Sequence, residues 1–139
     1  MGNSTSVRKI NFEDMQNVSK DKKTILISTL PPDRQECLVR NTISAEKEVA
    51  MINKSMSDGK AARIVVYGMN SSDGRVTDKC NQLLSLGFYN IYVYSGGLFE
   101  WLLLQDIYGA DLFPTTSRCT DHLQFKGSAV IDVLMIEES

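Results

Sequence analysis

The sequence predicts an α/β domain built on a mainly parallel central sheet. Short apolar runs alternate with segments of helical periodicity through the middle of the chain. This alternation is typical of parallel strands joined by right-handed crossover helices. The length of 139 residues suits one domain, and 42% hydrophobic with 23% charged residues is the balance of an ordinary globular protein.

Three segments are predicted as strands because they are short, apolar and rich in β-branched or aromatic residues. They are residues 25–29, Ile64–Tyr67 and Ile91–Tyr94. Pro31 and Pro32 end the first of them. Residues 37–39 are a further strand candidate. In such sheets ligands bind at the carboxyl ends of the strands, so the loop after Tyr67 is in the functional position.

Helices are expected to begin near Ser44, Gly74 and Gly97. In the first helix Ala45, Val49, Ile52 and Met56 recur at helical spacing, which predicts that they face inward, with Glu48 on the solvent side. The predicted core comprises Ile25, Ile27, Val49, Ile52, Val65, Cys80, Leu83, Val93 and Trp101.

The expected organisation is a flexible arm and lead-in at residues 1–19, the domain at residues 20–116, and a C-terminal extension at residues 117–139. Residues 130–136 fit an edge strand and a helix equally well.

The second half of the predicted domain follows a recognisable order of features. The strand ending in Tyr67 precedes a polar loop, Arg75 and a helix. The run Leu86-Gly87-Phe88-Tyr89-Asn90-Ile91-Tyr92-Val93-Tyr94 then leads through Ser95-Gly96-Gly97 to Trp101. This order resembles the second half of a rhodanese domain over roughly residues 60–108, while the first half of the chain is less similar. The resemblance implies a three-layer α/β/α fold.

The chain departs from that family where the chemistry is expected. In rhodaneses the catalytic cysteine follows the strand's last aromatic residue, and its thiolate carries sulfur within a cradle of backbone N–H groups. Here Gly68 follows Tyr67, and no cysteine lies between Gly68 and Lys79. The resemblance therefore implies a non-catalytic branch with no catalytic residue. The vestigial active-site loop comprises Gly68, Met69, Asn70, Ser71, Ser72, Asp73, Gly74 and Arg75.

Two enzymatic alternatives remain open. A sulfurtransferase would need a displaced cysteine, for which Cys80 is the candidate, although its place on the helix's apolar stripe indicates a buried structural thiol. A phosphatase-like enzyme would use the Arg75 loop, since the distance from Met69 to Arg75 equals the spacing of rhodanese-fold phosphatases. A thioether is not a nucleophile, however, and Asp73 would oppose anion binding. We expect Asp73 to take part of the anion's place by capping the helix, with Arg75 then structural and paired with Asp73 or with a backbone carbonyl.

The first six residues match the pattern for N-myristoylation of Gly2. One myristoyl chain gives only marginal membrane binding, to which Arg8 and Lys9 would add on an anionic surface. We therefore expect a cytoplasmic protein with reversible contact at the cytoplasmic face of a membrane. Three widely spaced cysteines suit such a reducing compartment.

The expected partner is a protein of unknown identity. Phe99, Tyr108 and Phe113 are candidates for a binding face, although core packing also explains the local concentration of aromatic residues. A net charge of −2 gives no basis for nucleic-acid binding. The single histidine, His122, is expected to be solvated, and no metal or cofactor is expected.

Overall fold

The computed structural model describes residues 7–119 and 121–131. Its centre is a parallel sheet with the strand order β1-β4-β3-β2. The strands are β1 (Arg8–Ile10), β2 (Ile25–Ser28), β3 (Ile64–Tyr67) and β4 (Ile91–Tyr94). The three predicted strands and their parallel pairing are confirmed, and Ile64 of β3 lies in register with Ile25 and Ile91.

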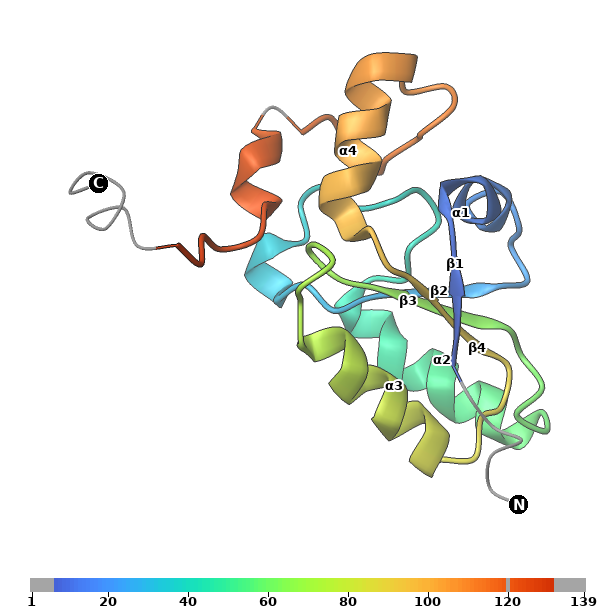
Figure 1. Cartoon of the computed structure of the whole chain (residues 1–139). Helices are drawn as coiled ribbons and strands as arrows, with labels where there is room; N and C mark the ends of the chain where they lie inside the picture. The colour runs from blue at the N-terminus through green and yellow to red at the C-terminus, as the bar shows by residue number, and fades with distance from the viewer. Residues whose placement is uncertain (1–6, 120, 132–139) are drawn as a thin grey trace.

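Helices cover both faces of the sheet, which confirms the three-layer arrangement (Figure 1). Two helices, α1 and α4, lie over one face, and α2 and α3 lie over the other. The bounds are α1 (Phe12–Val18), α2 (Ala45–Ser57), α3 (Arg75–Ser85) and α4 (Gly97–Tyr108), with short 3₁₀ turns η2 (Pro32–Arg34) and η3 (His122–Phe125). The three predicted helix starts are therefore confirmed.

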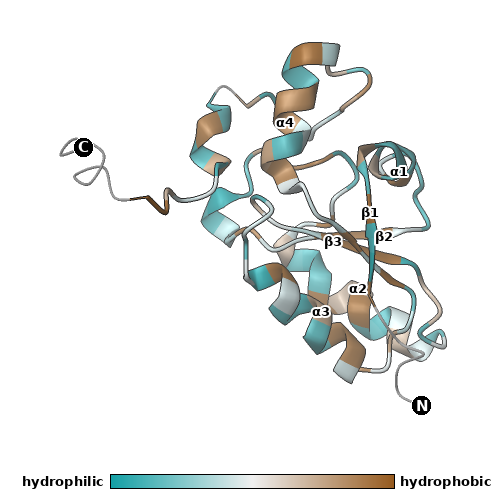
Figure 2. Cartoon of the chain, in the orientation of Figure 1, coloured by the Kyte–Doolittle hydropathy of each residue, from teal (hydrophilic) through white to brown (hydrophobic). Residues whose placement is uncertain are grey.

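The core is divided by the sheet into two clusters. Successive side chains of a strand point to opposite faces, so Val65 and Tyr67 of β3 pack with α1 and α4, whereas Ile64 and Val66 pack with α2 and α3. The brown colour along the central strands in Figure 2 reflects their apolar side chains, which are buried on both faces of the sheet. The predicted core residues that are buried are Ile25, Ile27, Ile52, Val65, Cys80, Leu83 and Trp101.

Two predicted core residues are not buried. Val49 is 68% exposed, because α2 is turned so that Ile52 and Ser55 face the sheet. Glu48, expected on the solvent side, is half-buried instead and forms an ion pair with Lys79 of α3. Val93 is only partly buried, since the neighbour of β4 on its outer side is the three-residue edge strand β1.

The ordered domain begins before residue 20, in the segment expected to be an arm and lead-in. β1 pairs with β4, and α1 buries Met15 and Val18 against the sheet. A strand with two charged residues in three gives no apolar run to detect. The start of α1 does carry a sequence signal, a capping box in which Asn11 and Asp14 each bond to the other's backbone N–H.

Residues 37–39 do not form a full strand. Val39 makes a single antiparallel bridge to Thr115, and Leu38 and Thr116 hold the two segments together. The terminal segment at residues 130–136 is described only to residue 131, where Val130 and Ile131 are exposed and irregular. Within the described residues, no helix has both the length and the apolar character needed to cross a membrane.

Candidate functional site

The loop at residues 68–74 connects the end of β3 to the beginning of α3, as predicted (Figure 1). It therefore lies at the carboxyl edge of the parallel sheet, where α/β proteins place their ligands. Its backbone N–H groups and the first turn of α3 would favour an anion at this position.

A carboxylate of the chain itself occupies the loop. Oδ2 of Asp73 accepts hydrogen bonds from the Met69 N–H at 2.9 Å and from the Thr29 hydroxyl at 3.2 Å. Oδ1 accepts from the Arg75 N–H at 3.1 Å. The Asp73 side chain is only 5% exposed. The Asp73 carboxylate thus lies within the loop as expected, whereas the N-cap of α3 is Gly74 and has no side-chain cap hydrogen bond.

Arg75 completes the arrangement through its guanidinium group. Nε donates to Oδ1 of Asp73 at 2.8 Å, and Nη2 donates to Oδ2 at 3.0 Å. Burial alone would raise the pKa of Asp73, but the hydrogen bonds from Arg75 and Met69 outweigh it and hold the pKa below the ordinary value of 3.8. The same pairing raises the pKa of Arg75. The pair is therefore ionised at neutral pH, and Arg75 bonds to an internal carboxylate.

Gly68 stands where the resemblance places the catalytic cysteine, and it has no room for a side chain. A Cβ at this position would lie 2.6 Å from Cγ2 of Val76 and 2.7 Å from Oδ2 of Asp73. Heavy atoms do not approach this closely without a shift of the neighbours. A cysteine at residue 68 would therefore have to displace Asp73.

The first turn of α4 contacts the loop from a second side. The Gly68 carbonyl accepts from the Leu98 N–H, and the Met69 carbonyl accepts from the Phe99 N–H, both at 2.9 Å. Gly97 has a φ of +69°, and a Cβ there would lie 2.8 Å from the backbone nitrogen of Asn70. A glycine is needed here for both conformation and space.

The segment that contains η3 contacts the loop from a third side. Asn70 Nδ2 donates to the Phe125 carbonyl at 2.9 Å, and Asn70 Oδ1 accepts from the Ser72 N–H at 2.9 Å. Met69 is partly buried against the core, while Ser71, Ser72 and Gly74 are exposed. Of the eight loop residues, the structure joins the Asp73 carboxylate to the Arg75 guanidinium and to the backbone N–H groups of Met69 and Arg75. The Asn70 side chain is not part of this network. Thr29, which the sequence interpretation did not include, joins it from the end of β2.

Cys80 lies in the core. Its side chain belongs to the cluster beneath α3, with Leu83 and Ile91, and burial raises the pKa of its thiol. The structure confirms the part of the interpretation that places the Cys80 side chain in the core.

The prediction that Phe99, Tyr108 and Phe113 form a binding face is wrong for Phe113. This ring is buried and packs edge-on against Trp101, with the centroids 5.0 Å apart. Phe99 is half-buried, and only Tyr108 is exposed. The apolar side chains that do face solvent in this region are Leu103, Ile107, Tyr108 and Leu112.

Gly2 lies outside the described residues. Arg8 and Lys9 are exposed on β1, and the Arg8 guanidinium stacks 5.1 Å from the Tyr92 ring centroid. His122 is half-buried and therefore only partly exposed to solvent, and its Nε2 lies 3.0 Å from the Cys119 carbonyl oxygen. Within residues 7–119 and 121–131, no three His, Cys, Asp or Glu side chains are placed to hold a metal ion.

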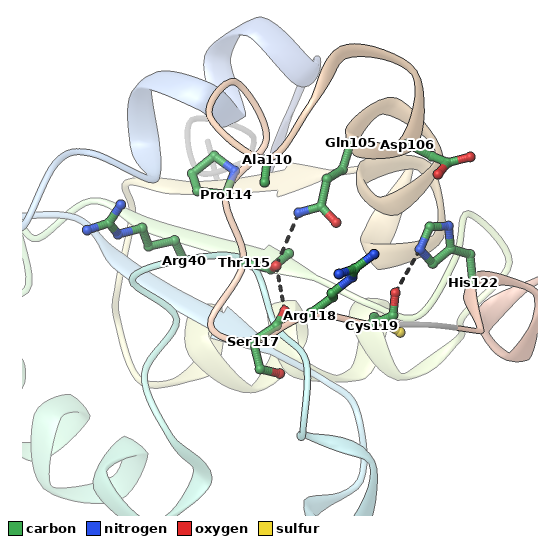
Figure 3. A pocket seen from close by; sticks show the side chains of 10 residues that line it. All are labelled: Arg40, Gln105, Asp106, Ala110, Pro114, Thr115, Ser117, Arg118, Cys119 and His122. Carbon is green, nitrogen blue, oxygen red and sulfur yellow. Dashed lines mark hydrogen bonds between the residues drawn. The ribbon is translucent and has the colours of Figure 1, made fainter.

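A separate cavity lies away from the loop at residues 68–74. It has a volume of about 770 Å³ and lies between the C-terminal half of α4 and residues 114–119 (Figure 3). Arg40, Arg118, Cys119 and His122 contribute to its lining. All of these lining residues except Arg40 lie within residues 105–122. The sequence did not reveal this cavity because it forms only when the chain after α4 folds back beside the helix.

Comparison with known proteins agrees with the fold described above. The family model described as a rhodanese-like domain matches residues 12–104. Among solved structures, the rhodanese-like domain of Anabaena sp. Alr3790 is 16% identical, with 91% of this chain and 93% of that chain covered at a TM-score of 0.55. The single-domain sulfurtransferase RDL2 of Saccharomyces cerevisiae is 17% identical, covering 78% and 97% at a TM-score of 0.51. The BH2092 protein of Bacillus halodurans is 16% identical, covering 73% and 74% at a TM-score of 0.55. A search of curated proteins gave no significant match.

Proposed function

Because the chain belongs to the rhodanese-like domain family, we propose that it is a member without sulfurtransferase activity that acts as a protein-binding module. The observation that carries the proposal is the Asp73 carboxylate in the active-site loop. It is bonded to the Met69 and Arg75 N–H groups and to the Arg75 guanidinium.

The chemistry of sulfur transfer supports this proposal. The reaction needs a thiolate at the end of the central strand and free N–H donors that stabilise an incoming anion. Here the donors already bind Asp73, whose negative charge repels thiosulfate or phosphate. Gly68 and Met69 at the end of β3 offer no nucleophile.

A displaced cysteine is the competing proposal, and the surroundings of Cys80 argue against it. The thiol is 5% exposed, and its raised pKa disfavours the reactive thiolate. To form a persulfide there, thiosulfate would have to enter the core between α3 and the sheet and reach the Cys80 sulfur.

Thiosulfate:cyanide sulfurtransferase and aryl-phosphatase assays on the purified chain test the proposal. We expect both rates to equal those of buffer, while yeast RDL2, described as a sulfurtransferase, serves as the active comparison in the first assay. Turnover that is lost in Cys80→Ser, with a persulfide mapped to Cys80, would replace this proposal with the displaced-cysteine enzyme.

The binding surface that we propose is the apolar face formed by Leu103, Ile107 and Tyr108 of α4 together with Leu112 in the turn after the helix. α4 is apolar on most sides, and Figure 2 shows brown segments in the half that extends away from the sheet. Asp106 and Asp111, both exposed, flank the apolar face. We therefore infer a protein partner that offers an apolar contact bordered by basic residues.

A matched pair of substitutions tests this surface. Ile107 and Val49 are β-branched, exposed to 69% and 68%, and lie on helices in opposite layers. A protein captured from the native host is produced in pure form, and its affinity is measured by calorimetry. Ile107→Glu should weaken binding by at least about tenfold, and Val49→Glu should leave it unchanged. Equal affinity for both variants would contradict the proposal. A wild-type dimer that Ile107→Glu dissociates would make the occupant a second copy of this chain.

Reversible membrane contact is the other part of the proposal. A myristoyl group on Gly2, supported by the exposed cations Arg8 and Lys9 on β1, would supply a weak anchor.

A further inference from the structure

Two cysteines distant in sequence lie in segments that the fold pairs side by side. Leu38 and Thr116 join these segments, with the Thr116 N–H donating to the Leu38 carbonyl at 2.8 Å and the Leu38 N–H donating to the Thr116 hydroxyl at 3.0 Å. Next along this pairing, the Cys37 thiol donates to the Ser117 carbonyl at 3.4 Å. Cys119 follows two residues later, so both thiols are brought to the same place by main-chain pairing.

The surroundings place the two sulfur atoms against one cavity. Cys37 and Cys119 both line a cavity of about 190 Å³, and Cys119 packs against the core cluster that contains Cys37. Both are free thiols in the structure. Burial, followed by the neighbouring Cys119 thiol, raises the pKa of Cys37 to about 12.

We propose that Cys37 and Cys119 form a reversible redox pair whose disulfide ties the C-terminal extension to the domain. This proposal is independent of the function proposed above. The oxidant is a peroxide, and the reductant that reverses the reaction is a small dithiol or thiol.

Exposure assigns different roles to the two sulfurs. Cys119 is half-buried at the edge of the 770 Å³ cavity beside His122, so a small oxidant reaches it from solvent (Figure 3). Cys37 is only 4% exposed. Cys119 is therefore the thiol that meets the peroxide, and Cys37 is the thiol that resolves the product.

The steps balance in atoms and electrons. The Cys119 thiolate attacks one peroxide oxygen, the O–O bond breaks, and hydroxide leaves, so sulfur loses two electrons and becomes a sulfenic acid. The Cys37 sulfur then attacks the Cys119 sulfur, the S–O bond breaks, and the Cys37 proton leaves with the hydroxide as water. Two thiols and one peroxide thus give one disulfide and two waters.

The disulfide has a predictable structural effect. It would fix residues 117–119, which form part of the wall of the large cavity, against the segment around Cys37. It would close a loop of roughly 80 residues, and a constraint of that length on the unfolded chain raises thermal stability.

The test uses the full reduced chain treated with hydrogen peroxide, then denatured and alkylated with N-ethylmaleimide. Reduced protein takes up three maleimides, because the chain has three cysteines. We expect the oxidised protein to take up one, on Cys80, with a mass loss of about 2 Da before alkylation. Peptide mapping should identify a Cys37–Cys119 disulfide, and dithiothreitol should reverse both this bond and a rise in Tm of several degrees.

Variants separate the roles. Cys80→Ser should oxidise like the wild type, Cys119→Ser should form no disulfide, and Cys37→Ser should stop at a sulfenic acid on Cys119 that dimedone labels. Three outcomes would each overturn the proposal. The first is a disulfide to Cys80, and the second is a disulfide between chains. The third is three intact thiols in a solution where the peroxide has oxidised reduced glutathione. The wild-type peptide map decides the question even if Cys37→Ser fails to fold.

Discussion

The carboxylate of Asp73 holds the guanidinium of Arg75 through two hydrogen bonds, from Nε to Oδ1 at 2.8 Å and from Nη2 to Oδ2 at 3.0 Å. In a rhodanese-like loop the corresponding donors face the place of an external anion. Here the anion is a side chain of the same loop, two residues before the arginine.

Removal of this internal anion should cost stability. Asp73→Ala leaves the Met69 and Arg75 N–H groups without their acceptor, and we expect a loss of about 1–3 kcal/mol in the free energy of unfolding. Asp78→Ala is the control, because this exposed carboxylate lies in the first turn of the same helix, and the expected loss is under about 1 kcal/mol. Urea denaturation of the two variants checks this difference, and equal losses would contradict it.

The contribution of Asp73 should depend on pH in one direction. Its pKa in the folded state is lower than the ordinary value of 3.8, so the ionised form stabilises the folded chain. The difference in unfolding free energy between wild type and Asp73→Asn should be constant above about pH 5 and should shrink as the pH falls through the folded-state pKa. Denaturation at a series of pH values measures it. A difference that grows on acidification would show that the pKa is raised instead.

Restoring a thiol should not restore sulfur transfer. We expect Gly68→Cys to be less stable than wild type, because its Cβ would meet Val76 and Asp73 at less than 3 Å. Met69→Cys provides a thiol next to an unchanged Asp73. Neither variant should show thiosulfate:cyanide turnover above wild type. Turnover by either single variant would mean that the missing cysteine was the only defect.

A buried hydroxyl should hold the segment before α2 to the sheet. The Tyr67 hydroxyl accepts from the Val39 N–H at 3.1 Å and lies 2.7 Å from the Thr42 hydroxyl, with the ring fully buried. Tyr67→Phe should therefore destabilise the chain by about 1–3 kcal/mol, since the Val39 N–H loses its partner. Tyr89→Phe, at a residue that is 54% exposed, is the matched control and should change stability by less than about 0.5 kcal/mol.

Lipid modification of Gly2 predicts a simple mass change. Expression in a host with N-myristoyltransferase should add about 210 Da to the chain that lacks Met1. Gly2→Ala should lose this mass and any fraction bound to anionic vesicles while keeping the wild-type Tm. The absence of the added mass in wild type would reject the modification.

Several features were predictable because they depend on local composition. The runs at Ile64–Tyr67 and Ile91–Tyr94 are apolar on both faces, which only a covered parallel sheet accommodates, and the helix starts near Ser44, Gly74 and Gly97 were correct. Val49 was wrong because α2 presents Ile52 and Ser55 to the sheet, and helical periodicity alone does not fix how the helix is rotated about its axis. β1 was missed because a strand of three residues carries no local pattern. Its place at the sheet edge depends on its pairing with β4, which is distant in the sequence.

By itself, the sequence determined that no thiol follows Tyr67, that a polar loop with Asp73 and Arg75 stands there, and that Cys80 belongs to an apolar helix face. These are properties of residue type and spacing along one segment. Only the tertiary structure decided that Thr29 joins the Asp73 network, that Phe113 is buried against Trp101, and that Cys37 and Cys119 line one cavity. Each of these contacts joins segments that come together only when the sheet and its helices pack, and so no local pattern specifies them.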